Sequence, residues 1–255
     1  MALIDTHSHC AWGIDDGIAD QQAFMRLIEM AKQDGISAII ATPHLIPGMH
    51  DKADVERIKQ RLQEAQAAAD ALQMKLYAGA EIMLNAEYMR LFQTQLYLPL
   101  GASSYVLVEF DAAWPLGTAA AVEERLYELI VMGLRPLIAH AERYFRKRSE
   151  LSRIQEWVSM GCVIQVNRTS LLGHGGRIMR RNALALIEQG LAHIVATDAH
   201  RVEGKRIERL SDVESFLKKH EGEEIASLLL RENPGRILRD EKLISLPAVK
   251  HRFIR

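Results

Sequence analysis

One unit recurs along this chain: an amphipathic segment, a glycine, and a short apolar run that ends in polar residues. The glycines are Gly35, Gly133, Gly161 and Gly190, and each stands where a helix would end on a residue with left-handed backbone. The runs that follow cover residues 38–44, 136–140, 163–167 and 193–198. They are continuous and rich in β-branched residues, which is typical of parallel strands buried on both faces. The unit therefore predicts a parallel β/α architecture.

The segments before the glycines carry apolar residues at helical spacing, which predicts helices that pack on a sheet. Three such stripes are Phe24, Leu27, Ile28 and Ala31; Val122, Leu126, Leu129 and Ile130; and Leu151, Ile154 and Val158. Further strands are expected at residues 2–6, 76–79 and 105–108, which brings the predicted number to seven. An open doubly wound sheet would give the same alternation. A barrel is favoured because ionisable residues follow nearly every strand rather than one switch point.

Bulk properties exclude several classes of protein. The 255 residues contain no linker or low-complexity tract, so we expect one domain over residues 1–255. A net charge of -1 provides no field that would attract nucleic acid. No run approaches the roughly 20 apolar residues of a membrane span, and two cysteines are too few for a secreted disulfide scaffold. We expect a cytoplasmic protein without membrane insertion.

Histidines and carboxylates stand at the ends of successive predicted strands. Carboxyl ends of parallel strands lie on one face, so these side chains can converge although they span almost 200 residues. The set is His7, His9, Asp16, His44, Glu81, Glu109, His140, Asp198 and His200. The sixth strand offers only Asn167.

This combination of side chains is typical of a metal cluster. His7 and His9 point to the same side because strand side chains alternate with period two. Carboxylates can bridge two cations about 3.5–4 Å apart, and a nitrogen/oxygen set suits manganese, iron or zinc. A single histidine at a strand end is more often structural, but nine ionisable groups buried together without a cation would each cost several kcal/mol. Five other histidines lack this placement and are interpreted as surface or structural: His50, His174, His193, His220 and His251.

The motifs resemble a known family. Residues 4–9 read Ile-Asp-Thr-His-Ser-His, followed by Asp15-Asp16-Gly17, and later by the runs 41–44, 79–81, 108–110, 138–144 and 196–200. In order and spacing they resemble the PHP (polymerase and histidinol phosphatase) superfamily. Within it, they look like the CpsB/CapC-type manganese-dependent protein-tyrosine phosphatases of bacterial exopolysaccharide and capsule clusters. The resemblance covers residues 2–238.

The resemblance implies a distorted, TIM-like (β/α)7 barrel with a trinuclear manganese cluster, in which iron or zinc could substitute. It implies that the substrate is a phosphotyrosine protein, a bacterial tyrosine autokinase. The nine strand-end residues match the family's metal ligands, and Arg143 matches an arginine that contacts phosphate. Two motifs differ from the family pattern. Leu45 to Gly48 stand where a second histidine or arginines are frequent, and the second phosphate-binding cation could be Lys205 or Arg206.

Several assignments stay open in the sequence. Asp15 could replace Asp16 as a ligand, and Asp111 lies on the same strand face as Glu109. Arg143 begins a basic cluster and is expected to bind phosphate with its planar guanidinium. The rest of that cluster is interpreted as a solvated helix start, and residues 250–255 as a solvated tail; the cluster comprises Arg146, Lys147 and Arg148.

The expected reaction is in-line attack of a metal-activated water on phosphorus, with His44 or His200 as an acid if ligation leaves either free. Cys162 and Arg168 have the spacing of cysteine-dependent tyrosine phosphatases, but strand-forming residues separate them, so a cysteine nucleophile is not expected. Three alternatives remain. The chain could hydrolyse a small ester such as histidinol phosphate, be an amidohydrolase, or be a non-catalytic PHP module. An amidohydrolase usually has a bridging lysine where this chain has Glu109.

Overall fold

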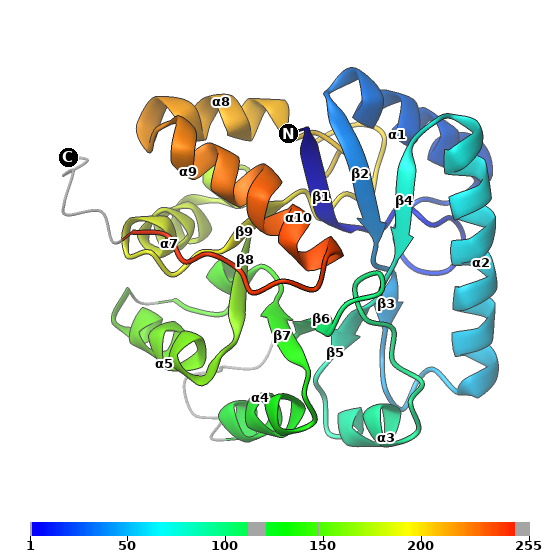
Figure 1. Cartoon of the computed structure of the whole chain (residues 1–255), viewed down its shortest axis with the longest axis horizontal. Helices are drawn as coiled ribbons and strands as arrows, with labels where there is room; N and C mark the ends of the chain where they lie inside the picture. The colour runs from blue at the N-terminus through cyan, green and yellow to red at the C-terminus, as the bar shows by residue number, and fades with distance from the viewer. Residues whose placement is uncertain (1, 112–120, 147, 248–255) are drawn as a thin grey trace.

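The computed structural model describes residues 2–111, 121–146 and 148–247, and every strand pair in it is parallel. One sheet has the order β1-β2-β4 and the other the order β3-β5-β6-β7-β8-β9 (Figure 1). The strands are β1 (Leu3–Ser8), β2 (Ile36–Ala41), β3 (His44–Leu45), β4 (Lys75–Ala78), β5 (Glu81–Met83), β6 (Tyr105–Glu109), β7 (Arg135–Ile138), β8 (Val163–Asn167) and β9 (Ile194–Ala196).

Two of the seven predicted strands are interrupted, which explains the nine. Pro43 separates β2 from β3, since proline has no N–H for the ladder. Gly79 and Ala80 separate β4 from β5. A Cβ on Gly79 would lie 3.0 Å from Leu100 and 3.1 Å from Ile40, so a larger residue would crowd this break. Both short strands pair further along the same path, and their residues His44 and Glu81 are register partners.

The strands return to β1, as expected for a distorted barrel. Ser8 and Ala199 form a parallel bridge, and the His9 N–H donates to the Ala199 carbonyl at 2.8 Å. Towards the amino ends of the strands, η4 (Leu228–Glu232) contacts both β1 and β9. The predicted TIM-like fold class is thus confirmed.

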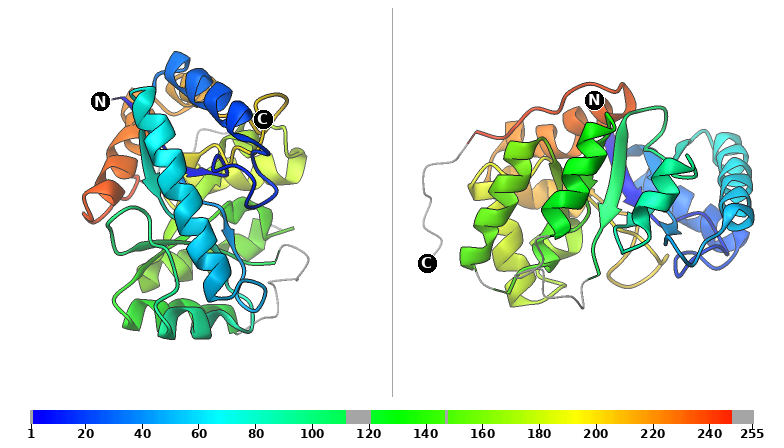
Figure 2. Two further views of the ribbon diagram at one scale, coloured as in Figure 1. Left: turned by 90° about the vertical axis from the view of Figure 1, so that its right-hand side faces the viewer. Right: turned by 90° about the horizontal axis from the view of Figure 1, so that it is seen from below.

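Helices cover the outside of the strands, with α2 running along one side of the molecule (Figure 2). The three predicted apolar stripes lie in α1, α4 and the η3–α5 region, and their central residues Leu27, Leu126 and Ile154 are fully buried. Gly161 ends α5 with φ 108°, as predicted from the recurring unit. The helices are α1 (Gln21–Gln33), α2 (Lys52–Ala71), α3 (Tyr88–Gln93), α4 (Ala121–Val131), η2 (Ala141–Arg143), η3 (Arg148–Leu151), α5 (Ser152–Met160), α6 (Arg168–Leu171), α7 (Arg177–Glu188), α8 (Ser211–His220), α9 (Glu223–Ser227) and α10 (Asn233–Leu238).

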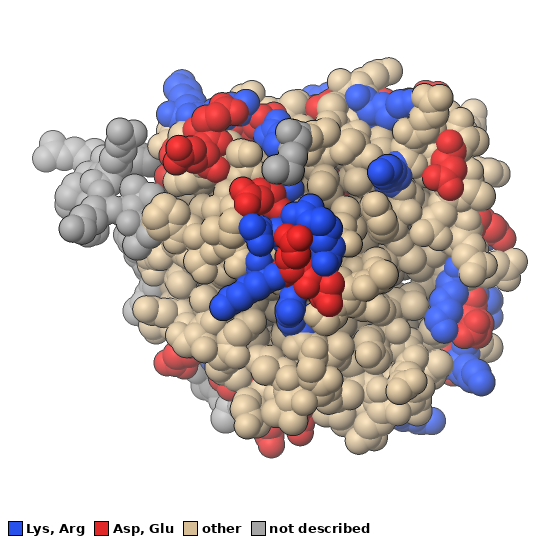
Figure 3. Space-filling view, viewed as in Figure 1, with Lys and Arg blue, Asp and Glu red and all other residues tan. Residues whose placement is uncertain are grey.

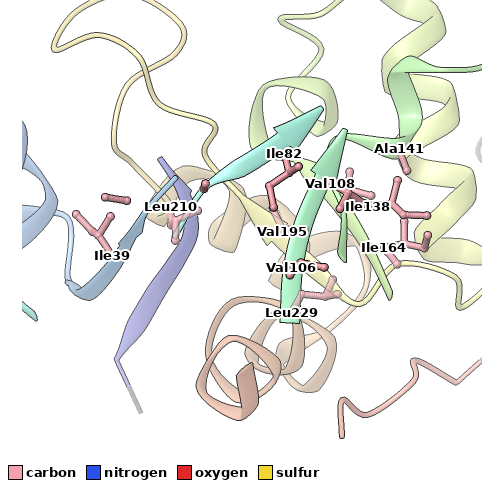
Figure 4. Close-up of a cluster of buried hydrophobic side chains, with 14 of the residues drawn as sticks. Ile39, Ile82, Val106, Val108, Ile138, Ala141, Ile164, Val195, Leu210 and Leu229 are labelled. Atoms are coloured by element: carbon pink, nitrogen blue, oxygen red, sulfur yellow. The ribbon is translucent and has the colours of Figure 1, made fainter. Parts of the chain in front are cut away.

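The main hydrophobic core joins neighbouring strands to the surrounding helices. Figure 4 shows part of it, with Val106, Val108, Ile138 and Ile164 on β6, β7 and β8. All four are fully buried. No helix in the described part of the chain is long and apolar enough to cross a membrane.

The amino ends of the strands carry a surface of paired charges rather than a site. Figure 3 shows lysine, arginine and carboxylate side chains gathered over α10 on this face. Arg239 and Arg236 pair with Glu241 at 2.9 and 3.5 Å, and Arg135 pairs with Asp240 at 3.6 Å. The opposite, carboxyl ends of the strands are where barrel proteins place their chemistry.

Candidate metal centre

The carboxyl ends of the strands bring the predicted ligands together. The buried carboxylate of Glu81 lies at the middle of the group. Its Oε2 is 3.3 Å from His7 Nε2, 3.1 Å from His9 Nε2 and 3.3 Å from His44 Nδ1. Its Oε1 is 2.8 Å from His140 Nε2. Residues from β1, β3, β5 and the turn after β7 therefore meet at one carboxylate, as the strand-end pattern predicts.

The remaining ligands complete a set of overlapping groups. Each group offers ligand atoms within 4.8 Å of one another. The groups are His9, Asp16, His44 and His200; His7, His9 and Asp198; and His44, Glu81 and Glu109. With His140, which also lies 3.7 Å from Glu109 Oε2, these groups contain all nine predicted residues. Two members reach the surface: the side chain of Asp16 is 61% exposed and that of His44 is 25% exposed.

Outer partners orient the histidines so that one ring nitrogen faces the centre. His9 Nδ1 lies 2.7 Å from Asp15 Oδ2, and a carboxylate can only accept, so this nitrogen carries the proton. In the same way, His200 Nδ1 donates to the Asp198 carbonyl at 3.1 Å. Nε2 of both rings then faces the site, where it can coordinate an ion in its deprotonated form, as metal-binding histidines require.

Asp15 and Asp16 have different positions, which the sequence left open. Asp15 accepts from His9, from the Gly17 N–H at 2.9 Å and from the His44 N–H at 3.1 Å. Its oxygens are therefore directed at the loop and at His9. Asp16 Oδ1 instead lies 3.5 Å from His44 Nε2 and 3.3 Å from His200 Nε2. This geometry favours Asp16 as the ligand and Asp15 as the residue that holds His9.

A buried amide chain on β8 joins the predicted ligands, and its member Gln165 was not among the residues predicted from the sequence. Gln165 Oε1 accepts from His7 Nδ1 and from the His140 N–H, both at 3.0 Å. Gln165 Nε2 donates to Asn167 Oδ1 at 2.6 Å, and Asn167 Nδ2 donates to Asp198 Oδ2 at 2.8 Å. A signal was present, because Gln165 and Asn167 are two residues apart in an apolar strand and so share one face.

Two ligands have unusual backbone conformations. His140 has φ 34° and Asp198 has φ 54°, in the left-handed region that non-glycine residues seldom occupy. Each residue lies two positions after the end of a strand, β7 for His140 and β9 for Asp198. Strained residues of this kind concentrate at functional sites, where surrounding structure holds them in place.

The electrostatics of the site are dominated by its carboxylates. Burial opposes protonation of His9, but hydrogen bonds to Asp15 and Glu81 outweigh it and raise its pKa to about 10. His7 is likewise buried, and Glu81 and Asp198 raise its pKa. Glu81 resists protonation despite its burial because the histidines around it lower its pKa. His200 differs: burial and the neighbouring His9 lower its pKa to about 3.

These residues fit a group of divalent transition-metal ions. The donor atoms are imidazole nitrogens and carboxylate oxygens, without thiolates, which suits manganese, iron or zinc. His44 Nδ1 is buried without a hydrogen bond, although Glu109 Oε1 lies 3.1 Å away. An imidazole nitrogen left without a hydrogen-bond partner among ligand-type groups is what an ion would coordinate. The inward-facing nitrogens of His7, His9 and His140 lie against Glu81 through protons that a bound cation would displace.

Two arginines lie at the rim of this centre. Arg143 Nη2 donates to Asp198 Oδ2 at 2.7 Å, and Arg206 Nη2 donates to Asp198 Oδ1 at 2.8 Å. The Arg206 side chain also reaches His200 Nε2 at 2.9 Å. Lys205 is exposed, and only its backbone carbonyl contacts a neighbour, Arg168, in the described part of the chain. Of the two predicted candidates for a second phosphate contact, only Arg206 faces the site.

The remaining candidates lie elsewhere. Asp111 follows the end of β6, is exposed, and belongs to none of the ligand groups. Cys162 is buried, which raises its pKa to about 12, and Arg168 is held by Asp212 at 2.5 and 2.8 Å. A thiol so far from ionisation, at the start of a strand, does not support a cysteine nucleophile.

The histidines outside the set have structural surroundings. His193 Nδ1 accepts from the Ile164 N–H at 3.2 Å, and burial lowers its pKa to about 4. His50 Nδ1 accepts from the Ile46 N–H at 3.0 Å. His174 is exposed, and His220 contacts a phenylalanine ring. His251, the tail at 250–255, Lys147 and the side chain of Arg148 lie outside the described residues.

Comparison with known proteins identifies relatives along nearly the whole chain. The family model for capsular polysaccharide synthesis, CpsB/CapC, matches residues 3–239. The tyrosine-protein phosphatase YwqE of Bacillus subtilis is 30% identical over 248 residues, which cover 96% of this chain and 95% of YwqE. The tyrosine-protein phosphatase CpsB of Streptococcus pneumoniae is 26% identical over 245 residues, 94% of this chain and 99% of CpsB.

Solved structures agree with this assignment. A crystal structure from the work on YwqE of Bacillus subtilis and CpsB of Streptococcus pneumoniae superposes on this chain with a TM-score of 0.81. That work describes the two proteins as unique metal-dependent tyrosine phosphatases. The superposed structure is 28% identical in sequence and covers 98% of this chain and 100% of its own. The phosphotriesterase homology protein of Escherichia coli matches with a TM-score of 0.61 at 12% identity over 93% of this chain and 98% of its own, which indicates a shared fold. The chain therefore belongs to the CpsB/CapC family.

Proposed function

We propose that this chain is a metal-dependent protein-tyrosine phosphatase of capsule or exopolysaccharide synthesis, and that its substrate is a phosphorylated tyrosine autokinase. One observation carries the chemistry: nine histidine and carboxylate side chains meet at the carboxyl ends of the strands, with Arg143 and Arg206 beside them. The named relatives, YwqE and CpsB, are tyrosine phosphatases and support the substrate class.

The nine residues would hold three ions, and manganese is the metal we propose. The three ligand groups overlap at His9 and His44, and because Asp15 holds His9 Nδ1, only Nε2 of His9 is available to an ion. When bound, such ions supply Lewis acidity and lower the pKa of water from about 15.7 towards about 7. Asp15 and Gln165 contribute by fixing the rings of His9 and His7 so that their free nitrogens face inward.

Arg143 and Arg206 are the proposed binding groups for the phosphoryl oxygens. Each guanidinium group donates from its Nη2 to a different oxygen of Asp198. Nη1 and Nε of Arg143 form no hydrogen bond that the described residues account for, so both keep N–H donors for phosphoryl oxygens. Two guanidinium groups so placed would neutralise the charge that develops on the equatorial oxygens.

The leaving group needs little protonation. Tyrosine leaves as a phenolate whose conjugate acid has a pKa of about 10, well below that of a serine or sugar alcohol. His200, one candidate acid from the sequence, has its pKa lowered to about 3 by burial and by His9, so it is neutral at pH 7 and has no proton of this kind to give. The low basicity of a phenolate leaving group therefore favours an aryl phosphate over an alkyl phosphate.

The proposal is tested by hydrolysis of a phosphotyrosine peptide and of histidinol phosphate by the same metal-counted sample. We expect thorough chelation to abolish hydrolysis and manganese to restore it, with the peptide preferred. Iron and zinc are added in parallel to identify the most effective ion. Full activity in a sample verified to be free of metal would refute the metal mechanism. A clear preference for histidinol phosphate would instead assign the chain to the small-ester phosphatases.

A further inference from the structure

Four exposed arginines lie beside the turn that carries Arg143; we name them the arginine rim, Arg146, Arg177, Arg180 and Arg181. Three of them belong to the first half of α7, which packs against η2. Asn182 fixes this contact, because its Nδ2 donates to the carbonyls of Glu142 at 3.1 Å and Phe145 at 2.8 Å.

A second contact joins the two parts of the rim. Arg181 Nη2 donates to the Arg146 carbonyl at 2.8 Å, so the start of α7 is tied to the chain that follows the Arg143 turn. Both segments follow the carboxyl ends of strands, β7 and β8, and so lie on the face of the metal centre. The rim is therefore tied by hydrogen bonds to the segment that carries Arg143.

The rim has a surplus of positive charge. None of its four guanidinium groups forms an ion pair within the described residues, whereas the nearby Arg153 and Arg168 pair with Glu123 and Asp212. The sequence contains no Asp or Glu between Glu156 and Glu188. One carboxylate, Glu150, lies close, and it accepts from the backbone N–H of Arg146 at 3.0 Å.

Helix electrostatics make this arrangement unfavourable for folding. The amino end of a helix carries partial positive charge and is stabilised by acidic side chains, but the first turn of α7 has none and begins with Arg177. Arg180 and Arg181 follow within the next turn. Arg181 gains the hydrogen bond to the Arg146 carbonyl, but Arg177 and Arg180 break the local preference without an ion pair among the described residues, which points to a function rather than to stability.

We infer that the arginine rim binds acidic or phosphorylated residues that flank the target phosphotyrosine in the substrate protein. The inference rests on the proposed phosphatase function. Guanidinium groups are suited to carboxylate and phosphate groups, and the rim continues the pair formed by Arg143 and Arg206. A nucleic acid is disfavoured as the occupant because the net charge of the whole chain is -1. Arg146 thus gains a role beyond that of a solvated helix start.

The test compares two phosphotyrosine peptides of equal length, one with flanking glutamates and one with flanking glutamines. The rim variant is Arg146→Gln, Arg177→Gln and Arg180→Gln in one chain, which spares the tie made by Arg181. The matched control removes three exposed charges near the amino ends of the strands, away from the site: Lys75→Gln, Lys219→Gln and Lys242→Gln. All proteins are loaded with manganese and are also assayed with p-nitrophenyl phosphate.

We expect the rim variant to lose about tenfold in kcat/KM on the acidic peptide, because each exposed charge pair contributes about two- to threefold. Its activity on the glutamine peptide and on p-nitrophenyl phosphate should stay within twofold of wild type, and the control variant should match wild type throughout. Raised salt should reduce the preference for the acidic peptide in wild type and in the control variant, but not in the rim variant.

Binding of a fluorescent acidic peptide that carries a non-hydrolysable phosphotyrosine analogue keeps the two proposals separate. If no protein hydrolyses either peptide, the phosphatase proposal fails, and weaker binding by the rim variant alone would still support the rim. Equal losses on both peptides, or equal binding by rim and control variants, would overturn the inference. The inference would also be overturned if an oligothymidylate displaced the labelled peptide as effectively as the unlabelled acidic peptide does.

Discussion

Replacing Gln165 by methionine should weaken metal binding more than it weakens the fold. The two side chains are similar in size, but methionine cannot accept from His7 Nδ1 or from the His140 N–H, nor donate to Asn167. The direction of this chain is set at its far end, because the Asp198 carboxylate can only accept. Asn167 must therefore donate to Asp198 and accept from Gln165, which turns the Gln165 oxygen towards His7.

The expected loss follows from these contacts. Removing an outer partner of a ligating histidine typically costs 10–100-fold in metal affinity, roughly 1.4–2.7 kcal/mol. The buried N–H of His140 also loses its acceptor, which costs about 1–3 kcal/mol of stability in the metal-free protein. We expect both effects in Gln165→Met: a metal dissociation constant raised 10–100-fold, and a modest loss in the free energy of unfolding.

A control on the same strand separates the two effects. Ile164 is fully buried and is not among the ligand contacts, so Ile164→Val should cost about 0.5–1.5 kcal/mol of stability and leave metal affinity unchanged. Metal affinity is measured by competition with a chromophoric chelator, and stability by urea unfolding of the chelated proteins. Should Gln165→Met keep wild-type metal affinity while losing stability as Ile164→Val does, the glutamine serves packing alone and the argument fails.

Three further predictions concern groups at and near the site. Arg143→Ala should lose about 10²–10³ in rate on a phosphotyrosine peptide, roughly 2.7–4 kcal/mol, and Arg143→Lys should recover part of this loss. The metal content, checked by elemental analysis, should not change. A near-wild-type kcat/KM for Arg143→Ala would remove the arginine from the mechanism. Arg206→Ala should lose much more activity than Lys205→Ala in the same assay, because only Arg206 reaches Asp198 and His200, whereas equal losses would contradict this placement. Cys162→Ser should stay within a few-fold of wild type in turnover, since burial holds the thiol pKa at about 12, and a loss of several orders of magnitude in a folded, metal-loaded variant would revive the cysteine mechanism.

A last prediction in this group concerns pH. The pKa of His9 is raised to about 10 in the folded protein from an ordinary value of 6.5, so the stability that its proton contributes is complete below about pH 6.5 and is lost as the pH rises towards 10. Thermal unfolding of the chelated protein should therefore shift to lower temperature between pH 7 and 10, more than that of the manganese-loaded protein. Parallel curves for the two forms would show that ions do not replace these protons.

The sequence was sufficient to predict the strand positions and the convergence of the nine side chains, because both follow from position along the chain. An apolar run after a glycine marks a buried strand, and the polar residue at its end marks the active face. His7, Glu81 and Asp198 were predicted in this way and lie within one group of contacts. Local patterns could not show that Pro43 and the Gly79-Ala80 pair would each break a strand in two.

The choice between neighbours was also beyond the sequence. Asp15 and Asp16 are adjacent in one loop, and only the path of the backbone turns one towards His9 Nδ1 and the other towards His44 and His200. The same holds for Lys205 and Arg206. The sequence places Gln165 in an apolar strand but cannot show its partners, because these lie in β1 and in the turn after β7, 158 and 25 residues away.

The backbone conformations and the orientation of the ligands have a common cause. Left-handed backbone costs roughly 1–2 kcal/mol at a residue other than glycine, so His140 and Asp198 need compensation. The His140 N–H is held by Gln165 at 3.0 Å, and the Asp198 N–H by the His7 carbonyl at 2.9 Å. Both anchors belong to the chain that also fixes the His7 ring and the Asp198 carboxylate. One set of buried hydrogen bonds therefore stabilises the strained turns and directs the ligands. This set joins β1, the turn after β7, β8 and the turn after β9. It therefore couples the geometry of the metal centre to the return of the barrel onto its first strand.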